Sequence, residues 1–90
     1  MEPGHQPIPN RLKMHRKMMG YKQKEVARLL GLYNTAPLSE WENGVSMPTA
    51  HNLIRLSVLY RTYVNELYTE YCIEVREVLQ EMEFEVFKDR

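Results

Sequence analysis

Three glycines and a proline divide the first half of this 90-residue chain into short pieces, and they constrain its fold more than any other feature. Gly20, Gly31 and Gly44 each end a short run in which apolar side chains recur at helical spacing, and Pro48 precedes another. Glycine just after such a run is a common stop signal of a helix, and proline cannot continue one. The chain is therefore expected to fold as short helices joined by tight turns.

Apolar spacing and capping residues together predict five helices. No segment alternates between apolar and polar residues for long enough to predict a strand. The predicted fold class is therefore all-α, a five-helix bundle with helices over residues 10–20, 22–31, 35–44, 48–60 and 64–87, the last of them unbroken. The residues expected to face the core are Leu12, His15, Met18, Met19, Val26, Ala27, Leu30, Leu38, Trp41, Leu53, Ile54, Leu56, and Leu59 or Tyr60.

The chain is expected to form one small domain with an extension at each end. Residues 1–9 contain three prolines and a glycine and are interpreted as a flexible arm, residues 10–68 as the domain, and residues 69–90 as a helical extension. Hydrophobic residues make up 43% of the chain, enough for a modest core but not for an enzyme-sized cleft. The single cysteine, Cys72, excludes an internal disulfide, and no apolar run approaches membrane-spanning length. We therefore expect a cytoplasmic protein without a membrane partner.

Charge is distributed unevenly although the formal net charge is zero. Residues 1–28 carry seven Lys or Arg against two Glu, whereas residues 62–90 carry three against eight acidic residues. The two ends thus have net charges of +5 and −5. The basic end suits a polyanion such as DNA, and the acidic extension is expected to stay away from it.

Two short helices joined by a tight turn correspond to a helix-turn-helix unit. The stretches "YKQKEVARLLGL", "LSEWENGVSMP" and "NLIRLSVLYRTYVNELY" occur in the order found in the Cro-type, or Xre-like, helix-turn-helix DNA-binding family, and the chain resembles that family from about Arg11 to Tyr68. The resemblance implies a lambda-repressor-like domain that inserts the helix at 36–43 into the major groove of double-stranded DNA.

The resemblance also implies which residues contact phosphate. Gln23 lies where the family's glutamine meets a DNA phosphate, and Lys22 and Lys24 flank it. Lys22 replaces the hydroxyl residue that commonly caps this helix in the family. Arg16 occupies the position of an arginine that pairs with the glutamate of "WEN", here Glu42, with phosphate contact as its second role. In the turn after the third helix, the expected phosphate contacts are Asn43, Gly44 and Ser46.

Base readout is expected from the start and outer face of the third helix, which contains no lysine or arginine. One extra residue before this helix matches the longer turn of some relatives, which often carry arginine where Pro37 and Glu40 stand. An asparagine side chain can pair with adenine, a glutamate can accept from cytosine, and a small apolar side chain can touch the thymine methyl group. The residues predicted to lie nearest the major groove are Asn34, Thr35, Ala36, Pro37, Ser39 and Glu40.

Neither catalysis, nor a cofactor, metal or small-molecule substrate is expected. The three histidines share no metal-ligand spacing with Cys72, and no catalytic grouping of side chains is present. The function expected from the sequence is a sequence-specific transcriptional regulator, acting as a repressor. The alternative is a helix-turn-helix protein-interaction module or antitoxin-like subunit with little base readout.

The apolar stripe of the acidic extension leaves two arrangements open. Its members recur at helical spacing over more length than a small core can cover, while glutamates occupy the other sides. The helix at 69–87 either packs back on the bundle or forms a surface for a homodimer or another partner. The stripe consists of Tyr71, Val75, Val78, Leu79, Met82 and Val86.

Overall fold

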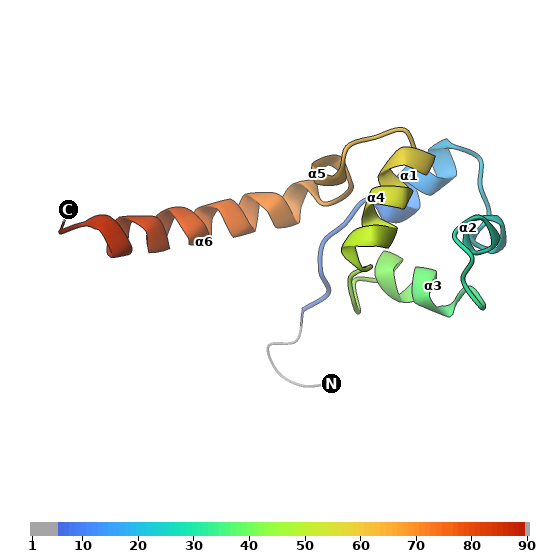
Figure 1. Cartoon of the computed structure of the whole chain (residues 1–90), viewed down its shortest axis with the longest axis horizontal. Coiled ribbons are helices and arrows are strands. Elements are labelled where there is room, and N and C mark those ends of the chain that lie inside the picture. Colours follow the sequence, from blue (N-terminus) through green and yellow to red (C-terminus); the bar gives the residue numbers. More distant parts are fainter. Residues whose placement is uncertain (1–5, 90) are drawn as a thin grey trace.

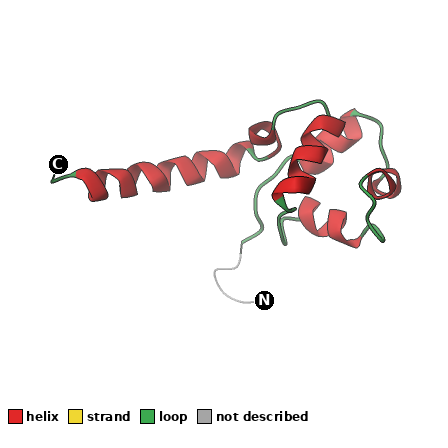
Figure 2. Ribbon diagram, in the orientation of Figure 1, coloured by secondary structure: helices red, strands yellow, loops and turns green. Residues whose placement is uncertain are grey.

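The computed structural model describes residues 6–89, which contain six helices and no strand. Four helices, α1 (Leu12–Met18), α2 (Gln23–Leu29), α3 (Ala36–Glu42) and α4 (Ala50–Leu59), form a bundle with the single-turn α5 (Val64–Leu67). The longest helix, α6 (Thr69–Phe87), extends away from this bundle (Figures 1 and 2). The predicted all-α class is confirmed.

The core lies where α1, α3 and α4 meet, with α2 and α5 closing its sides. Leu38 and Trp41 of α3 are buried as expected, as are Val26, Ala27 and Leu30 of the second helical segment. Among residues 6–89, the buried hydrophobic side chains are Leu12, Val26, Ala27, Leu30, Leu38, Trp41, Leu56, Tyr60, Leu67 and Tyr68.

Two residues expected in the core lie on the surface instead. Met18 is 72% exposed because α1 turns Leu12 and Arg16 toward the bundle, and Arg16 takes the inner position one turn after Leu12. Ile54 is 58% exposed because α4 buries Leu56 and leaves the neighbouring face open. Hydrophobicity alone does not decide burial when two adjacent faces of a short helix carry apolar residues.

The expectation of one unbroken helix from Val64 to Phe87 is wrong. Tyr68 has φ −132° and ψ 43°, which is not helical, and it separates α5 from α6. Leu67 and Tyr68 are both buried, so the chain leaves the helical conformation at the residue that fills the edge of the core. The interruption lets α6 leave in a new direction.

The root of α6 is held to the start of α1. The Arg11 N–H donates to Leu67 O at 2.7 Å, and Arg11 Nε donates to Glu70 Oε1 at 2.9 Å. The hydrogen bond from the Arg11 side chain lowers the pKa of the Glu70 carboxyl group below its ordinary value. None of the residues of α6, all of which the structure describes, is buried. Of the two arrangements left open for this helix, packing back along the bundle therefore does not occur beyond its first turn.

The segment just before α1 is anchored to the turn after α3. The Ile8 N–H donates to Gly44 O at 2.9 Å, and Ile8 packs against the core. Asn10 Nδ2 donates to Trp41 O and Glu42 O, while Asn10 Oδ1 accepts from the Leu12 N–H at 3.1 Å. The segment interpreted as a flexible arm thus has an attached part at residue 8, whereas residues 1–5 lie outside the described chain.

Candidate nucleic-acid interface

The start of α2 presents three of the expected phosphate contacts. Lys22 precedes the helix in an extended conformation, and its side chain makes no capping hydrogen bond. Its backbone N–H instead donates to Glu25 Oε1 at 2.8 Å, so Glu25 supplies the reciprocal half of a capping box that lacks the usual hydroxyl. Lys22 and Lys24 are exposed, and Gln23 between them is half-buried. The lysines therefore project beside the positive end of the helix dipole.

A buried carboxylate connects α1, α2 and α3. Glu42 accepts two hydrogen bonds from Arg16, from Nε at 2.6 Å and from Nη2 at 3.1 Å. The two side chains are 9% and 3% exposed, and the hydrogen bond to Glu42 raises the pKa of Arg16. Arg16 Nη1 also donates to Tyr21 O at 2.9 Å. The expected pairing of Arg16 with Glu42 is confirmed.

Gln23 joins this network, which the sequence did not indicate. Its Nε2 donates to Glu42 Oε1 at 2.9 Å, so one oxygen of Glu42 accepts from both Arg16 and Gln23. The bond fixes the first residue of α2 relative to the last residue of α3. The Gln23 amide can use its other N–H and its carbonyl oxygen to form hydrogen bonds with a bound ligand.

The side chain of Asn34, and not that of Thr35, caps the start of α3. Thr35 occupies the cap position but makes no side-chain capping bond. Asn34 Oδ1 accepts from the Ala36 N–H at 2.9 Å, as Asn10 does for Leu12 at the start of α1. Through this hydrogen bond Asn34, the residue expected to read adenine, also helps to start the helix. Its side chain is exposed. Its Nδ2 group still carries two donors.

The outer side of α3 carries the remaining expected base readers. Leu38 and Trp41 fix its inner side in the core. Ala36 and Glu40 are exposed, whereas Pro37 and Ser39 are half-buried, and Pro37 stands in the first turn, where it removes an N–H that has no partner within the helix. This outer surface is polar or small and carries one carboxylate.

The turn after α3 closes on the N-terminal segment. Gly44 has φ +74°, and a Cβ atom there would lie 2.5 Å from Ile8 O. Asn43 is exposed, with Nδ2 donating weakly to Ser39 Oγ at 3.4 Å, and Ser46 is half-buried. The Gly44 and Val45 N–H groups donate to Trp41 O and Glu40 O. At this turn, the Asn43 and Ser46 side chains remain as candidate phosphate contacts.

The residues expected to contact DNA do not all lie close to one another in the structure. The Gln23 side chain meets the C-terminal end of α3 through Glu42, whereas Asn34 and Thr35 lie at the opposite end of α3. Arg16 is buried within the network rather than displayed with the lysines. Sequence reasoning missed the role of Asn10 as a link between α1 and α3, because its partners are backbone carbonyls 31 and 32 residues away.

Other kinds of site find no support in the described part of the chain. Among residues 6–89, no group of three His, Cys, Asp or Glu side chains is arranged to hold a metal ion. No described helix has the length and apolar character needed to cross a membrane.

Two short helices, α2 and α3, joined by a turn and seated on α1 and α4, define the class of helix-turn-helix proteins. A family model described as Helix-turn-helix matches residues 12–67, which is more than half of the chain. The chain belongs to the Cro/Xre-type helix-turn-helix family, a family of DNA-binding regulators. No curated protein and no solved structure shows a significant match. The family match ends at Leu67, so α6 lies outside it.

Proposed function

We propose that the chain is a sequence-specific, DNA-binding transcriptional regulator that inserts residues 36–43 into the major groove. The observation that carries this proposal is the buried hydrogen-bond network in which Glu42 accepts from Arg16 and Gln23. The network fixes the phosphate-facing start of α2 relative to α3. Phosphate contacts position such a protein on the duplex, and base contacts then specify the sequence.

Affinity is assigned to the groups around α2 and to the turn after α3. Lys22 and Lys24 are exposed and release counterions when they neutralise phosphates. The Gln23 amide, already held by Glu42, donates its remaining N–H to a phosphate oxygen. Asn43 and Ser46 contribute from the turn, while Arg16 acts mainly by holding Glu42 in place.

Specificity is assigned to groups without positive charge. Asn34 Nδ2 donates to an acceptor on a base edge, because its Oδ1 is shared with the Ala36 N–H. Glu40 accepts from cytosine N4, Ser39 and Thr35 offer hydroxyl groups, and Ala36 and Pro37 contact a thymine methyl group. A well-made bidentate contact contributes about 1–3 kcal/mol of discrimination.

The regulator is further proposed to act as a repressor, by occupying its operator, as a cytoplasmic protein without catalytic activity. Two copies joined through residues 69–87 would hold two α3 helices against matching half-sites. Binding through two linked modules exceeds the affinity of either alone. The exposed apolar side chains of α6 support this assembly.

A DNA titration at increasing salt tests the proposal. The affinity for a duplex should fall linearly on a log–log plot, and Lys24→Ala should reduce the slope by about 0.9 for the lost phosphate contact. The control Lys88→Ala removes the same charge after the end of α6 and should leave both slope and affinity unchanged. A wild-type chain that shifts no duplex at low salt would contradict DNA binding.

The acidic surface of α6 favours a second candidate function, a protein-interaction module. Between Thr69 and Phe87, six glutamates and one arginine project from a helix with no buried residue. In this case the helix would bind a different protein, and DNA readout would be lost. Recovery of a stable foreign partner by the purified chain, together with no DNA shift at low salt, would support this function over the first.

A further inference from the structure

One side of α6 carries an apolar seam with a seven-residue repeat. Its members follow one another at intervals of three or four residues, which places them on one side of a helix that can pair with another helix. Beyond the first turn these side chains are 37 to 65% exposed. The seam consists of Cys72, Val75, Leu79, Met82 and Val86.

An apolar groove of about 500 Å³ continues this seam toward the bundle. The groove runs along α6 as far as Glu83, with Met47, Leu53 of α4 and Val64 of α5 on the side of the bundle. Tyr68 and Cys72 line it from the root of α6. A helix lying along the seam would therefore also contact the bundle at one of its ends.

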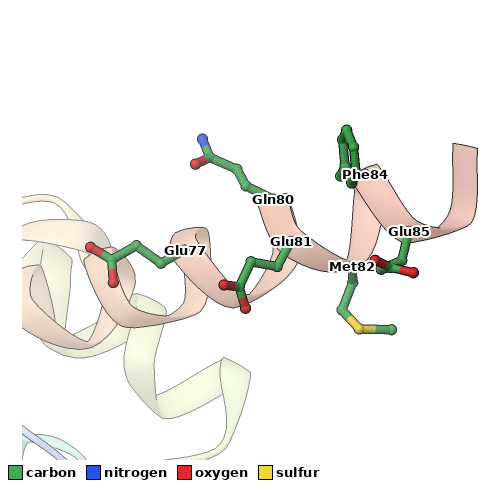
Figure 3. A pocket seen from close by; sticks show the side chains of 6 residues that line it. All are labelled: Glu77, Gln80, Glu81, Met82, Phe84 and Glu85. Atoms are coloured by element: carbon green, nitrogen blue, oxygen red, sulfur yellow. The ribbon is translucent and has the colours of Figure 1, made fainter. Parts of the chain in front are cut away.

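The charges beside the groove differ from the charge of the helix as a whole. Of the residues that the structure describes, Arg76 and Glu83 are the only charged ones that line the groove. By helical spacing Glu85 borders the opposite edge of the seam, and Figure 3 shows that Met82 of the seam and Phe84 leave the helix on opposite sides. Along the edge that lines the groove, the seam thus presents one positive and one negative group, seven residues apart, to whatever covers it.

We propose that a second copy of this chain covers the seam, with the two α6 helices antiparallel and a two-fold axis beside Gln80. This orientation rests on the homodimer in the proposed function. It brings Arg76 of each copy beside Glu83 of the other, so symmetry creates two ion pairs. In the core of the pair, Leu79 meets Met82 of the second copy, and Val75 meets Val86 of the second copy.

The same residues would not pair in a parallel dimer. Arg76 and Glu83 both immediately follow a seam residue, Val75 or Met82, and such positions face each other only between antiparallel helices. In a parallel pair they would lie beside Tyr71 and Val78, leaving the charges without partners. Charge complementarity therefore favours the antiparallel arrangement over the parallel one.

The groove enlarges what the helices could bury by themselves. A helix of 19 residues is about 28 Å long, which accommodates only two to three seven-residue repeats. Because the groove reaches the bundle, the C-terminal half of the second helix also contacts Met47, Leu53 and Val64. These contacts bring the buried surface area closer to the roughly 800 Å² per partner that a stable complex buries.

Charge reversal tests both the partner and the orientation. Sedimentation equilibrium of the full chain should show a dimer, and Arg76→Glu and Glu83→Arg should each raise its dissociation constant roughly tenfold or more by turning both ion pairs into repulsions. An equimolar mixture of the two variants should dimerise again, because every pair in the mixed dimer joins one basic and one acidic side chain. The double variant should also recover.

Glu81→Arg is the matched control, since it makes the same charge change as Glu83→Arg at a position outside the groove. It should not weaken the dimer. A wild-type chain that stays monomeric overturns the proposal and is the result expected if a foreign partner covers α6. Charge reversals that leave the dimer as tight as before, as expected for a parallel pair, or a mixture that fails to recover, overturn it as well. DNA binding is measured separately on the same variants, so loss of the dimer with retained binding to a duplex leaves the proposed DNA-binding function standing.

Discussion

Glu42 is the residue at which three helices of the DNA-binding domain converge. It accepts from Arg16 of α1 and Gln23 of α2 while it ends α3. A buried ion pair gives little net stability by itself, but removal of one partner leaves an uncompensated charge. Geometry is therefore the main contribution of this pair, because the same oxygen that satisfies Arg16 also orients the Gln23 amide.

Glu42→Gln should lower the free energy of unfolding by about 3–5 kcal/mol, because it leaves the Arg16 guanidinium buried without its carboxylate. Urea denaturation monitored by circular dichroism measures the loss. Glu40→Gln removes the same charge two residues earlier, at an exposed position, and should change stability by less than about 0.5 kcal/mol. Equal effects of the two substitutions would show that the network is not a structural requirement.

The sequence predicted part of this residue-scale arrangement. The pairing of Arg16 with Glu42 followed from the family resemblance and is confirmed by two short hydrogen bonds. The bond from Gln23 to Glu42 was not predicted, because it joins residues 19 positions apart and depends on how closely α2 and α3 pack. The readout by Asn34 and Glu40 stays a prediction.

Among the secondary-structure elements, the residues just outside the ends of the short helices decide where these helices begin and end. An asparagine two residues before the first helical residue receives a backbone N–H in both α1 and α3. The turn after α3 admits the N-terminal segment because Gly44 has no side chain. These local signals explain why α1 and α3 could be located from sequence, whereas the end of α5 could not. Apolar spacing continues across Tyr68, so the break is seen only in the backbone angles of this buried residue.

Gly44→Ala should destabilise the chain more than Gly20→Ala, although both glycines have left-handed backbone conformations, with φ +74° and φ +79°. At Gly20 the added methyl group meets nothing within 4 Å, so only the conformational cost of about 1–2 kcal/mol applies. At Gly44 it also displaces Ile8 and breaks its hydrogen bond, a further loss of about 0.5–1.5 kcal/mol. Thermal unfolding of the two variants checks the order, and equal losses would contradict anchoring of Ile8.

Alkaline pH should destabilise the bundle through its buried tyrosines. Burial raises the pKa of Tyr68 from 10.0 to about 12, and it also raises the pKa of Tyr60. Because the unfolded chain loses these protons first, stability is fully present below pH 10 and declines as the pH rises toward 12. Tyr68→Phe should make this decline shallower in urea titrations at several pH values.

Tyr33→Phe, at a fully exposed ring, is the control for that series. It should leave the alkaline decline as in the wild-type chain. The hydroxyl groups of Tyr60 and Tyr68 have no hydrogen-bond partner among the described residues, so Tyr68→Phe should not lower stability at neutral pH by loss of a hydrogen bond. A decline unaffected by Tyr68→Phe would mean that other groups control alkaline unfolding.

In the molecule as a whole, the basic residues and the acidic residues are separated in space. Residues 1–28 hold the net charge of +5, and they include α1 and α2 of the bundle, whereas the acidic α6 extends away (Figure 1). The sequence predicted this separation of charge, but not the direction of α6, which depends on the Tyr68 break and on the Arg11–Glu70 contact. In the proposed complex this separation would keep repulsion between α6 and DNA small, which suits the proposed role of α6 in joining two copies.

We propose that α3 reads bases with polar and acidic groups while neighbouring groups supply affinity. Selection of binding sites from a pool of random duplexes tests it most directly. We expect the wild-type chain to enrich one motif, Asn34→Ala and Glu40→Ala to change the bases enriched at individual positions, and Gln23→Ala or Asn43→Ala to weaken binding to every sequence alike. A wild-type chain whose selected pool stays random would contradict the claim.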